Sequence, residues 1–278
     1  MGRLPLGVLF PLGKYLGRLA FRVWGRRRRI TETNLRLCFP ELGAAQVTAM
    51  ARRVFEAVTL GVLELGVAWL NPRRDLRGRM KLVGVEHFRA ARGQGRGVVL
   101  LGAHFACLDI VSQALADLGG VDVMYRFNKN PVLEWVQLRG RRHYYRGVIE
   151  RQDTRAVLQA LKSGRAVWYA ADQDYGAKHS VFAPFFGVEA ATITATARFA
   201  ALNGSPVVML SNHRNYAERS WTIEISPPIE NYPTGDDQQD AHRINQVIEK
   251  EIRKHPEQYL WMHRRFKTRP PGEPGLYG

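Results

Sequence analysis

The sequence contains little cysteine, and none of it stands in a metal-binding pattern. Only two of the 278 residues are cysteine, Cys38 and Cys107. Neither belongs to a Cys-x-x-Cys pair or to a His/Cys cluster at zinc spacing, which excludes a disulfide framework and a structural zinc site. We therefore expect no bound metal and a reducing, cytoplasmic environment.

Long apolar runs are also lacking. The longest uncharged stretches are shorter than the ~20 apolar residues that a helix needs to cross a bilayer, so no transmembrane helix is predicted. The N-terminus does not follow the order of a signal peptide, because its apolar residues precede its basic run. The three stretches are Leu4–Gly13, Gly97–Leu108 and Phe199–Asn212.

Acidic residues are few relative to basic ones. The 41 Lys and Arg residues outnumber 25 Asp and Glu residues, which gives a formal net charge of +16. This excess predicts an anionic partner, such as phospholipid headgroups, nucleic acid, or an acidic or phosphorylated molecule. The nucleotide-binding signatures GxxxxGK and GxGxxG are absent from the predicted strand-to-helix junctions, so we expect no nucleotide cofactor.

Residues 1–30 are predicted to form an amphipathic, basic segment that contacts an anionic membrane surface. Apolar residues from Leu4 to Trp24 run into the cluster Arg26–Arg29, which is the pattern of an interfacial helix with a basic end. The alternative is a terminal helix that faces the core, followed by a solvated charge run. A nucleic-acid partner is not expected, because the interleaved residues are mostly aliphatic.

Residues 31–278 are predicted to form a single α/β domain with a mostly parallel central sheet flanked by helices. An amphipathic helix is expected over Ala44–Leu70, followed by alternating strands and helices. The expected strands are Met80–Val83, Val98–Leu101, Val121–Tyr125, Gly147–Ile149, Ala166–Ala170, Pro206–Leu210 and Trp221–Ile225. The expected helices are Ile110–Leu118, Pro131–His143, Thr154–Leu161, Ala190–Ala201 and Asp237–Lys254.

The candidate catalytic residues are His104 and Asp109, which follow the strand Val98–Leu101. Ligands of open α/β sheets gather at the carboxyl ends of the strands. A carboxylate there fixes the tautomer of an imidazole and raises its basicity, as a general base acting on an alcohol requires. Alone, the H-x4-D spacing is a weak pattern, because a lone histidine after a strand is more often structural. No GxSxG elbow is present, and Cys107 is interpreted as a small residue that packs in the core. A covalent acyl-enzyme is therefore not favoured.

The sequence around His104 resembles the glycerolipid and lipid A acyltransferase superfamily, whose members carry an H-x4-D or H-x4-E pair after a strand. Within it, the chain is most similar to the late acyltransferases of lipid A biosynthesis, the lauroyl and myristoyl transferases. Phe127 stands after Arg126 where a proline is common in that family. The matching stretches are Asn34–Glu41, Gly102–Asp109, Tyr125-Arg126 with Asn130-Pro131, Val167–Ala170 with Asp172–Gly176, Ser180–Phe182 with Pro184–Phe186, and Glu257–Lys267.

The resemblance implies transfer of a fatty acyl group from the thioester of an acyl carrier protein to a hydroxyl of a phosphorylated glucosamine lipid, a lipid A precursor. The acyl carrier protein and the phosphorylated glycolipid are the implied partners, with the phosphopantetheine thioester as donor and no bound cofactor. The alternative acceptor is another membrane glycolipid or a lysophospholipid. The implied location is the cytoplasmic face of the inner membrane, attached peripherally or monotopically through residues 1–30.

Four further residues at predicted strand ends are candidates for substrate binding. Arg126 and Arg151 follow two strands, and a guanidinium can bind a phosphate through two hydrogen bonds. Either could instead be a surface arginine. Asp172 and Asp174 follow another strand, where they would hydrogen-bond sugar hydroxyls or orient the arginines, or else cap a turn before Gly176.

Overall fold

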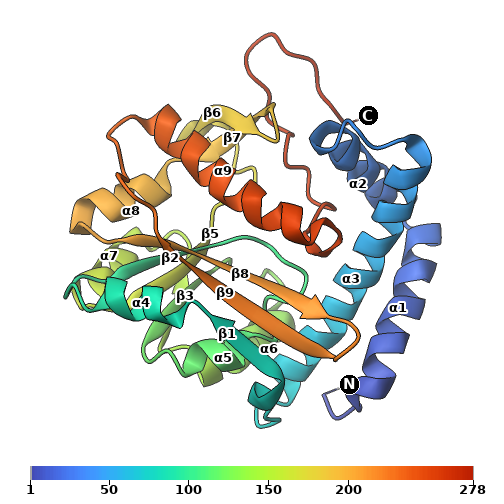
Figure 1. The fold of residues 1–278 in the computed structure, drawn as a ribbon, viewed down its shortest axis with the longest axis horizontal. Coiled ribbons are helices and arrows are strands. Elements are labelled where there is room, and N and C mark those ends of the chain that lie inside the picture. Colours follow the sequence, from blue (N-terminus) through green and yellow to red (C-terminus); the bar gives the residue numbers. More distant parts are fainter. Residues whose placement is uncertain (1, 278) are drawn as a thin grey trace.

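The N-terminal quarter of the chain forms three helices that lie along one side of an α/β body (Figure 1). The structure, a computed structural model, describes residues 2–277. Among these, no helix is both long and apolar enough to cross a membrane. The three helices are α1 (Leu6–Val23), α2 (Gly25–Cys38) and α3 (Ala44–Leu70).

The body is built on a sheet of seven strands in the order β1-β9-β8-β2-β5-β3-β4. Neighbouring strands in the described residues run parallel except β8 and β9, which pair antiparallel. The prediction of a mostly parallel α/β sheet is therefore confirmed. The strands are β1 (Met80–Val83), β2 (Val98–Gly102), β3 (Val121–Tyr125), β4 (Gly147–Glu150), β5 (Ala166–Ala170), β8 (Val207–Asn215) and β9 (Ser220–Pro228).

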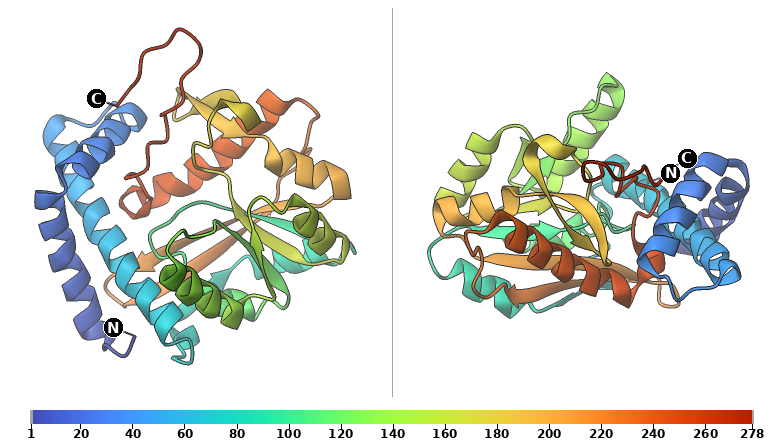
Figure 2. Two further views of the ribbon diagram at one scale, coloured as in Figure 1. Left: turned by 180° about the vertical axis from the view of Figure 1, so that it is seen from behind. Right: turned by 90° about the horizontal axis from the view of Figure 1, so that it is seen from above.

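Helices cover both faces of this sheet (Figures 1 and 2). Strand β2 is buried on both faces: Val99 and Leu101 pack in the core beneath α7, α8 and α9, whereas Val98 and Leu100 pack in the core beneath α4 and α5. A strand buried on both faces reads as a continuous apolar run, which made β2 recognisable in the sequence. The helices are α4 (Val85–Arg92), α5 (Ser112–Ala116), α6 (Pro131–Tyr144), α7 (Thr154–Lys162), α8 (Ala195–Asn203) and α9 (Asp237–Lys254).

The helix predicted over Ala190–Ala201 is wrong in its first part. Residues 190–193 belong to β7 (Val188–Ile193), which pairs antiparallel with β6 (Ser180–Phe185) in a separate two-stranded sheet. The hairpin is fixed by tertiary contacts: the Asn245 side chain of α9 donates to the carbonyl oxygens of Ala183 and Pro184. Such contacts outweigh the helix propensity of alanine.

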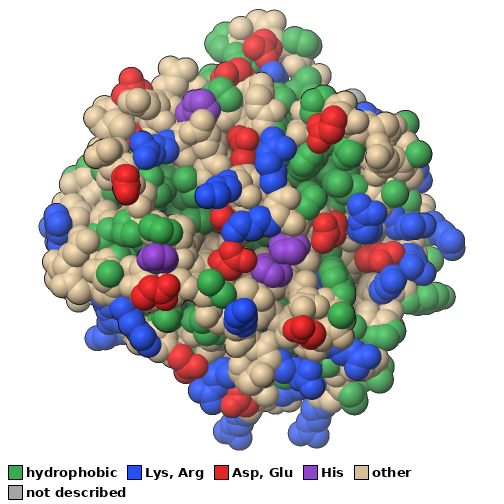
Figure 3. All heavy atoms as spheres, in the orientation of Figure 1, with side chains coloured by type: hydrophobic (Ala, Val, Ile, Leu, Met, Phe, Trp, Pro, Cys, Tyr) green, Lys and Arg blue, Asp and Glu red, His purple; other side chains and the backbone are tan. Residues whose placement is uncertain are grey.

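The segment predicted to contact a membrane forms α1 and the first part of α2, and its contact with a membrane stays a prediction. The inner face of α1 packs on α3 through buried residues that include Leu9 and Phe10. Its outer face leaves large apolar side chains exposed, and Figure 3 shows apolar and basic side chains together at the right-hand edge, over α1 and α2. Residue 30 lies within α2, so the predicted boundary does not separate two structural units. The exposed apolar residues are Val8, Tyr15, Leu19, Val23 and Trp24.

Candidate active site

The register of two central strands brings His104 and Asp172 together. Strands β2 and β5 are parallel neighbours, and Gly102 at the end of β2 pairs with Ala170 at the end of β5. His104 and Asp172 each follow their strand end by two residues. Their side chains meet at the carboxyl edge of the sheet, with His104 Nδ1 2.7 Å from Asp172 Oδ1. The other carboxylate oxygen, Oδ2, accepts the backbone N–H of His104 at 2.9 Å.

The two side chains of this pair differ in their exposure to water. The Asp172 side chain is 1% exposed, whereas the His104 side chain is 29% exposed. Burial alone would lower the pKa of His104, but the Asp172 carboxylate outweighs it and raises this pKa above its usual value. Burial likewise opposes ionisation of Asp172, yet the His104 charge and hydrogen bonds lower its pKa to about 2. The pair therefore consists of a permanent carboxylate and a partly accessible, more basic imidazole.

Asp109 does not hydrogen-bond His104, which differs from the expectation based on the H-x4-D spacing. Its Oδ1 accepts hydrogen bonds from the Trp69 indole N–H of α3 at 3.1 Å and from Arg141 Nη2 of α6 at 3.1 Å. The carboxylate that holds the imidazole belongs instead to Asp172. Asp109 remains close enough to raise the pKa of His104, while Arg141 lowers it. A role for Asp109 in turnover stays a prediction.

The loop that carries His104 is held from two sides. On one side, α3 approaches so closely at Gly61 that a Cβ there would overlap the carbonyl oxygen of Ala106. On the other side, the backbone N–H of Ala106 donates to the Gln258 carbonyl at 2.7 Å, and the Leu260 N–H donates to the His104 carbonyl at 3.1 Å. The imidazole therefore stands on a loop with little freedom to move, which preorganises it.

Arg126 and Arg151 lie at the rim of this site rather than against the pair. They follow β3 and β4, and the Arg151 guanidinium lies 5.4 Å from the centre of the Tyr175 ring. Burial and then the Asp172 charge raise the pKa of the Tyr175 hydroxyl, while Arg151 and Arg126 lower it. Both guanidinium charges are therefore near Tyr175, on the side of the sheet where Asp172 lies. Phosphate binding by either arginine stays a prediction.

Asp174 has a structural position. Its Oδ1 accepts the Gly176 N–H at 2.8 Å, and its two oxygens also bind the Thr268 N–H and hydroxyl. The turn-capping alternative is the one that the geometry supports. Both carboxylate oxygens thus hold the C-terminal segment against the loop after β5. This geometry does not support the sugar-binding role that we considered for Asp174 from the sequence.

Cys107 is unsuited to nucleophilic chemistry. Burial raises the pKa of its thiol to about 11, and the Asn212 side chain donates to its sulfur at 3.0 Å. A thiol that stays protonated near neutral pH is a poor nucleophile. The interpretation of Cys107 as core filler agrees with this environment.

Two residues near the pair, Arg141 and His263, were not among the candidate site residues predicted from the sequence. Arg141 came from a predicted helix, where a lone arginine carries no functional signal, and only the packing of α6 on α3 brings it to Asp109. His263 lies near Asp172 and His104, and burial lowers its pKa to about 4, so it is neutral near pH 7. Its place in the stretch Glu257–Lys267, which matched the family, was the available signal.

These features define an α/β protein in which a histidine and a buried aspartate meet at the carboxyl edge of a mostly parallel sheet. Sequence comparison agrees with this class. The family described as "Bacterial lipid A biosynthesis acyltransferase" matches residues 1–268, and the chain belongs to that family.

Individual relatives resemble the chain over nearly all of its length. It is 40% identical to the lipid A biosynthesis lauroyltransferase of Escherichia coli over 277 residues, which cover 99% of this chain and 90% of the relative. Identity to the palmitoleoyltransferase of the same organism is 40% over 276 residues, with 99% and 90% covered. Identity to its myristoyltransferase is 29% over 265 residues, with 95% and 82% covered.

Proposed function

We propose that the protein transfers a fatty acyl group from acyl carrier protein to a hydroxyl of a phosphorylated, glucosamine-based lipid A precursor. The observation that carries this proposal is the His104–Asp172 pair at the carboxyl edge of the sheet, in a chain that belongs to the lipid A acyltransferase family. The pair supplies a base for a hydroxyl proton, which is what direct attack of an alcohol on a thioester needs.

In this mechanism Nδ1–H of His104 donates to Asp172, which leaves Nε2 free to accept a proton. Nε2 removes the proton of the acceptor hydroxyl as its oxygen bonds to the thioester carbonyl carbon. The carbon–sulfur bond then breaks, and the imidazolium returns the proton to the leaving thiolate. Asp172 stabilises the imidazolium throughout, because its low pKa keeps it ionised.

The charge of the chain suits both substrates. Acyl carrier protein is acidic, and a net charge of +16 favours its approach. The donor thioester, carried on phosphopantetheine, is a substrate, so no bound cofactor is needed. Arg126 and Arg151, whose charges lie near Tyr175, would receive an anionic group such as a phosphate of the acceptor.

The acceptor is a membrane lipid, so the enzyme must reach a bilayer. We propose that α1 provides a first contact at the cytoplasmic face of the inner membrane, as a peripheral or monotopic element. The exposed apolar residues of its outer face and the neighbouring Arg26 and Arg29 supply the two signals, apolar and electrostatic, that reversible membrane attachment requires.

A radiolabelled acyl-transfer assay tests the proposal. The purified protein is incubated with acyl carrier protein that bears a radiolabelled acyl chain and with a detergent-dispersed lipid A precursor. In parallel reactions, acyl-coenzyme A replaces the donor or a lysophospholipid replaces the acceptor. His104→Ala should lower the rate by about 10²–10⁴-fold. His87→Ala, on α4, serves as the matched control and should keep the parent rate. A folded His104→Ala protein with near-parent turnover would refute the assignment.

A further inference from the structure

Helix α6 exposes the side chains that a helix usually buries. Its inward face carries the buried Glu134, Gln137 and Gly140, whereas Val132 and Trp135 are 66% and 59% exposed. The Glu134 carboxylate is occupied inside, where it accepts hydrogen bonds from the Tyr125 hydroxyl and the Asn128 N–H. Packing within the molecule therefore leaves Val132 and Trp135 largely exposed, and the Trp135 ring is covered only in part by the Arg139 guanidinium, 5.2 Å from its centre.

The apolar residues gather at the N-terminal end of α6. Leu133 is 51% exposed, and Phe127, in the loop just before the helix, is 56% exposed. In Figure 2 (right) α6 projects from the body on the side away from α9. Three large apolar side chains thus stand on the projecting helix and a fourth, Phe127, lies just before it, where contact with water costs free energy.

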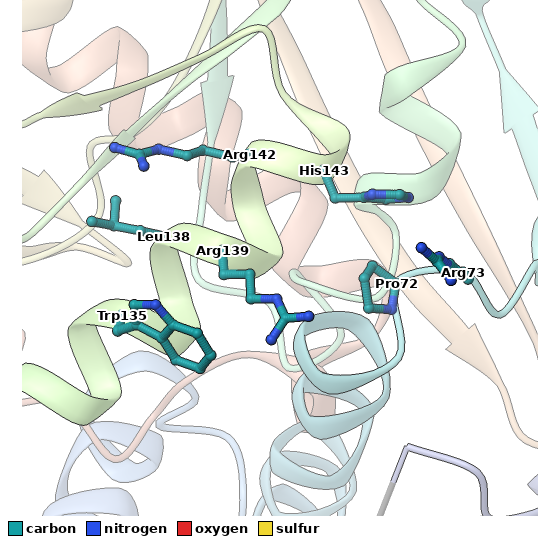
Figure 4. A pocket seen from close by; sticks show the side chains of 7 residues that line it. All are labelled: Pro72, Arg73, Trp135, Leu138, Arg139, Arg142 and His143. Atoms are coloured by element: carbon teal, nitrogen blue, oxygen red, sulfur yellow. The ribbon is translucent and has the colours of Figure 1, made fainter.

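A basic pocket lies along α6 from Trp135 to His143. A pocket of about 530 Å³ lies between this helix and the turn after α3, with Trp135 and Arg139 on one side and Pro72 and Arg73 on the other (Figure 4). Arg142 and His143 also line it, and no carboxylate does. Within residues 2–277, none of Arg73, Arg139 and Arg142 forms an ion pair.

The contrast with Arg141 makes this pocket distinctive. Arg141 points to the other side of α6 and pairs with Asp109. Figure 4 shows Arg139 and Arg73 on opposite sides of the pocket, with Arg142 pointing away from both. No carboxylate lines the pocket, so an anion bound there would meet uncompensated positive charge. Guanidinium groups bind phosphate oxygens through paired hydrogen bonds, so a phosphate group is the ligand that this chemistry favours.

We propose that this α6 surface, formed by Phe127, Val132, Leu133, Trp135, Arg139, Arg142 and Arg73, docks on a bilayer that contains anionic phospholipid. The apolar N-terminal end enters the boundary of the acyl chains, and the basic pocket holds a lipid phosphate. Val132, Trp135, Arg139 and Arg142 recur at helical spacing, so apolar and basic groups share one face along about 15 Å of helix. A membrane interface has the same order, with apolar acyl chains below and charged headgroups above.

This second contact would lie beside the active site, unlike the contact made by α1. Helix α6 begins a few residues after Arg126, and its Gly140 packs directly against Trp69, the residue that binds Asp109. A membrane-bound α6 would therefore hold the carboxyl edge of the sheet near the bilayer surface. The inference rests on the proposed function only in assuming a membrane lipid as acceptor.

Vesicle binding tests the inference without turnover. The full-length chain is sedimented with phosphatidylcholine vesicles, with and without phosphatidylglycerol, at low and high salt. Arg139→Gln/Arg142→Gln should weaken binding to the anionic vesicles by roughly 10- to 30-fold at low salt and have less effect at high salt. Leu133→Ser/Trp135→Ser should weaken binding at both salt concentrations. Leu202→Ser, whose side chain is 63% exposed on α8, and Arg155→Gln on α7 are the matched controls.

A second readout reports the depth of Trp135. Lipids brominated along the acyl chain should quench tryptophan fluorescence less in Trp135→Phe than in the parent. The α6 variants should keep parent turnover on detergent-dispersed acceptor, and His104→Ala should keep parent vesicle binding, so the two proposals fail separately. Parent-like vesicle binding and quenching in the folded α6 variants would overturn the inference. If the α6 variants bound vesicles like the parent but bound acyl carrier protein more weakly, the surface would be assigned to acyl carrier protein instead.

Discussion

His104 Nδ1 and Asp172 Oδ1 lie 2.7 Å apart although 68 positions separate the two residues in the chain. The contact follows from the pairing of Gly102 with Ala170, because each side chain stands two residues beyond its strand end. The same carboxylate also accepts the backbone N–H of His104. Asp172 therefore fixes both the loop and the ring, and leaves Nε2 as the nitrogen available to a substrate.

The first prediction concerns the pH dependence of Asp172→Asn. A general base acts in its neutral form, so activity falls as the pH drops through the pKa of His104, which Asp172 raises. Replacing the Asp172 carboxylate removes the group that raises the pKa of His104 most. We expect the acid limb of the kcat/KM profile to move to lower pH while turnover at neutral pH falls by about 10²-fold or more. Steady-state rates across pH measure both, and an unmoved acid limb would contradict the pairing.

The second prediction separates Asp109 from Asp172. Asp109→Asn removes the charge opposite Arg141, whose side chain is only 13% exposed, and should cost roughly 3 kcal/mol of stability. The acid limb should move less than in Asp172→Asn, since Asp109 has a smaller influence on the pKa of His104. Urea unfolding and pH profiles of both variants provide the comparison. An acid limb displaced as far in Asp109→Asn would restore Asp109 as the orienting partner.

The sequence predicted the central strands β2 and β5 well because they are buried, continuous apolar runs, and it also located the less buried strands β1 and β3. The expected ranges for β1, β3 and β5 coincide with the observed ones. The prediction failed at Ala190–Ala201, where an alanine-rich run suits both a helix and a packed strand. The pairing of β7 with β6 and its contacts with α9, such as the hydrogen bond between Asn245 and Thr192, select the strand.

For the site, the sequence identified His104 and Asp172 but not their contact. Proximity in the chain favoured Asp109 as the partner, whereas the strand order, which places β5 beside β2, favours Asp172. Strand order depends on the packing of the whole domain and has no local signature. The same reason kept Arg141 out of the candidate set, because its position depends on how α6 packs against α3.

The third prediction is a stability window for the His104–Asp172 pair. The lowered pKa of Asp172 stabilises the fold above its unfolded value near 3.8, and that contribution is lost as the pH falls toward about 2. The raised pKa of His104 stabilises the fold below its unfolded value of 6.5, and that contribution is lost as the pH rises through the folded value. The stability difference between parent and Asp172→Asn should peak between pH 4 and 6.5. Urea titrations across pH would show a flat difference if the pair did not form.

The fourth prediction refines the electrostatic contact of the N-terminal segment. Arg27 donates to the Met262 carbonyl and Arg28 to Glu32, so these two have structural roles. Arg26→Gln/Arg29→Gln should therefore lower membrane recovery by about tenfold at low salt with the fold intact. Flotation with native membranes measures the bound fraction.

The matched control for this prediction removes two exposed cations elsewhere, in Arg155→Gln/Lys162→Gln on α7. It changes the net charge equally but leaves α1 and α2 untouched. Equal loss of membrane binding in both double variants would mean that net charge, and not the position of Arg26 and Arg29, governs attachment.

The last prediction tests whether α3 fixes the catalytic loop. In an exposed helix, Gly→Ala stabilises by about 1 kcal/mol. At Gly61 the new Cβ would overlap the Ala106 carbonyl, so the loop after β2 must shift or α3 must retreat. Overpacking of this kind costs about 1–3 kcal/mol. Because Ala106 is two residues from His104, we expect Gly61→Ala to lose most of its turnover while circular dichroism shows a folded protein.

The control is Gly25→Ala at the start of α2, where a Cβ would meet nothing within 4 Å. It adds the same methyl group to a helix and should keep turnover and stability near those of the parent. The acid limb of the pH profile gives a further distinction: if Gly61→Ala moves His104 away from Asp172, the limb shifts to lower pH, as in Asp172→Asn. A Gly61→Ala enzyme with parent activity would mean that the loop is positioned by the C-terminal segment alone, through the hydrogen bond between Ala106 and Gln258.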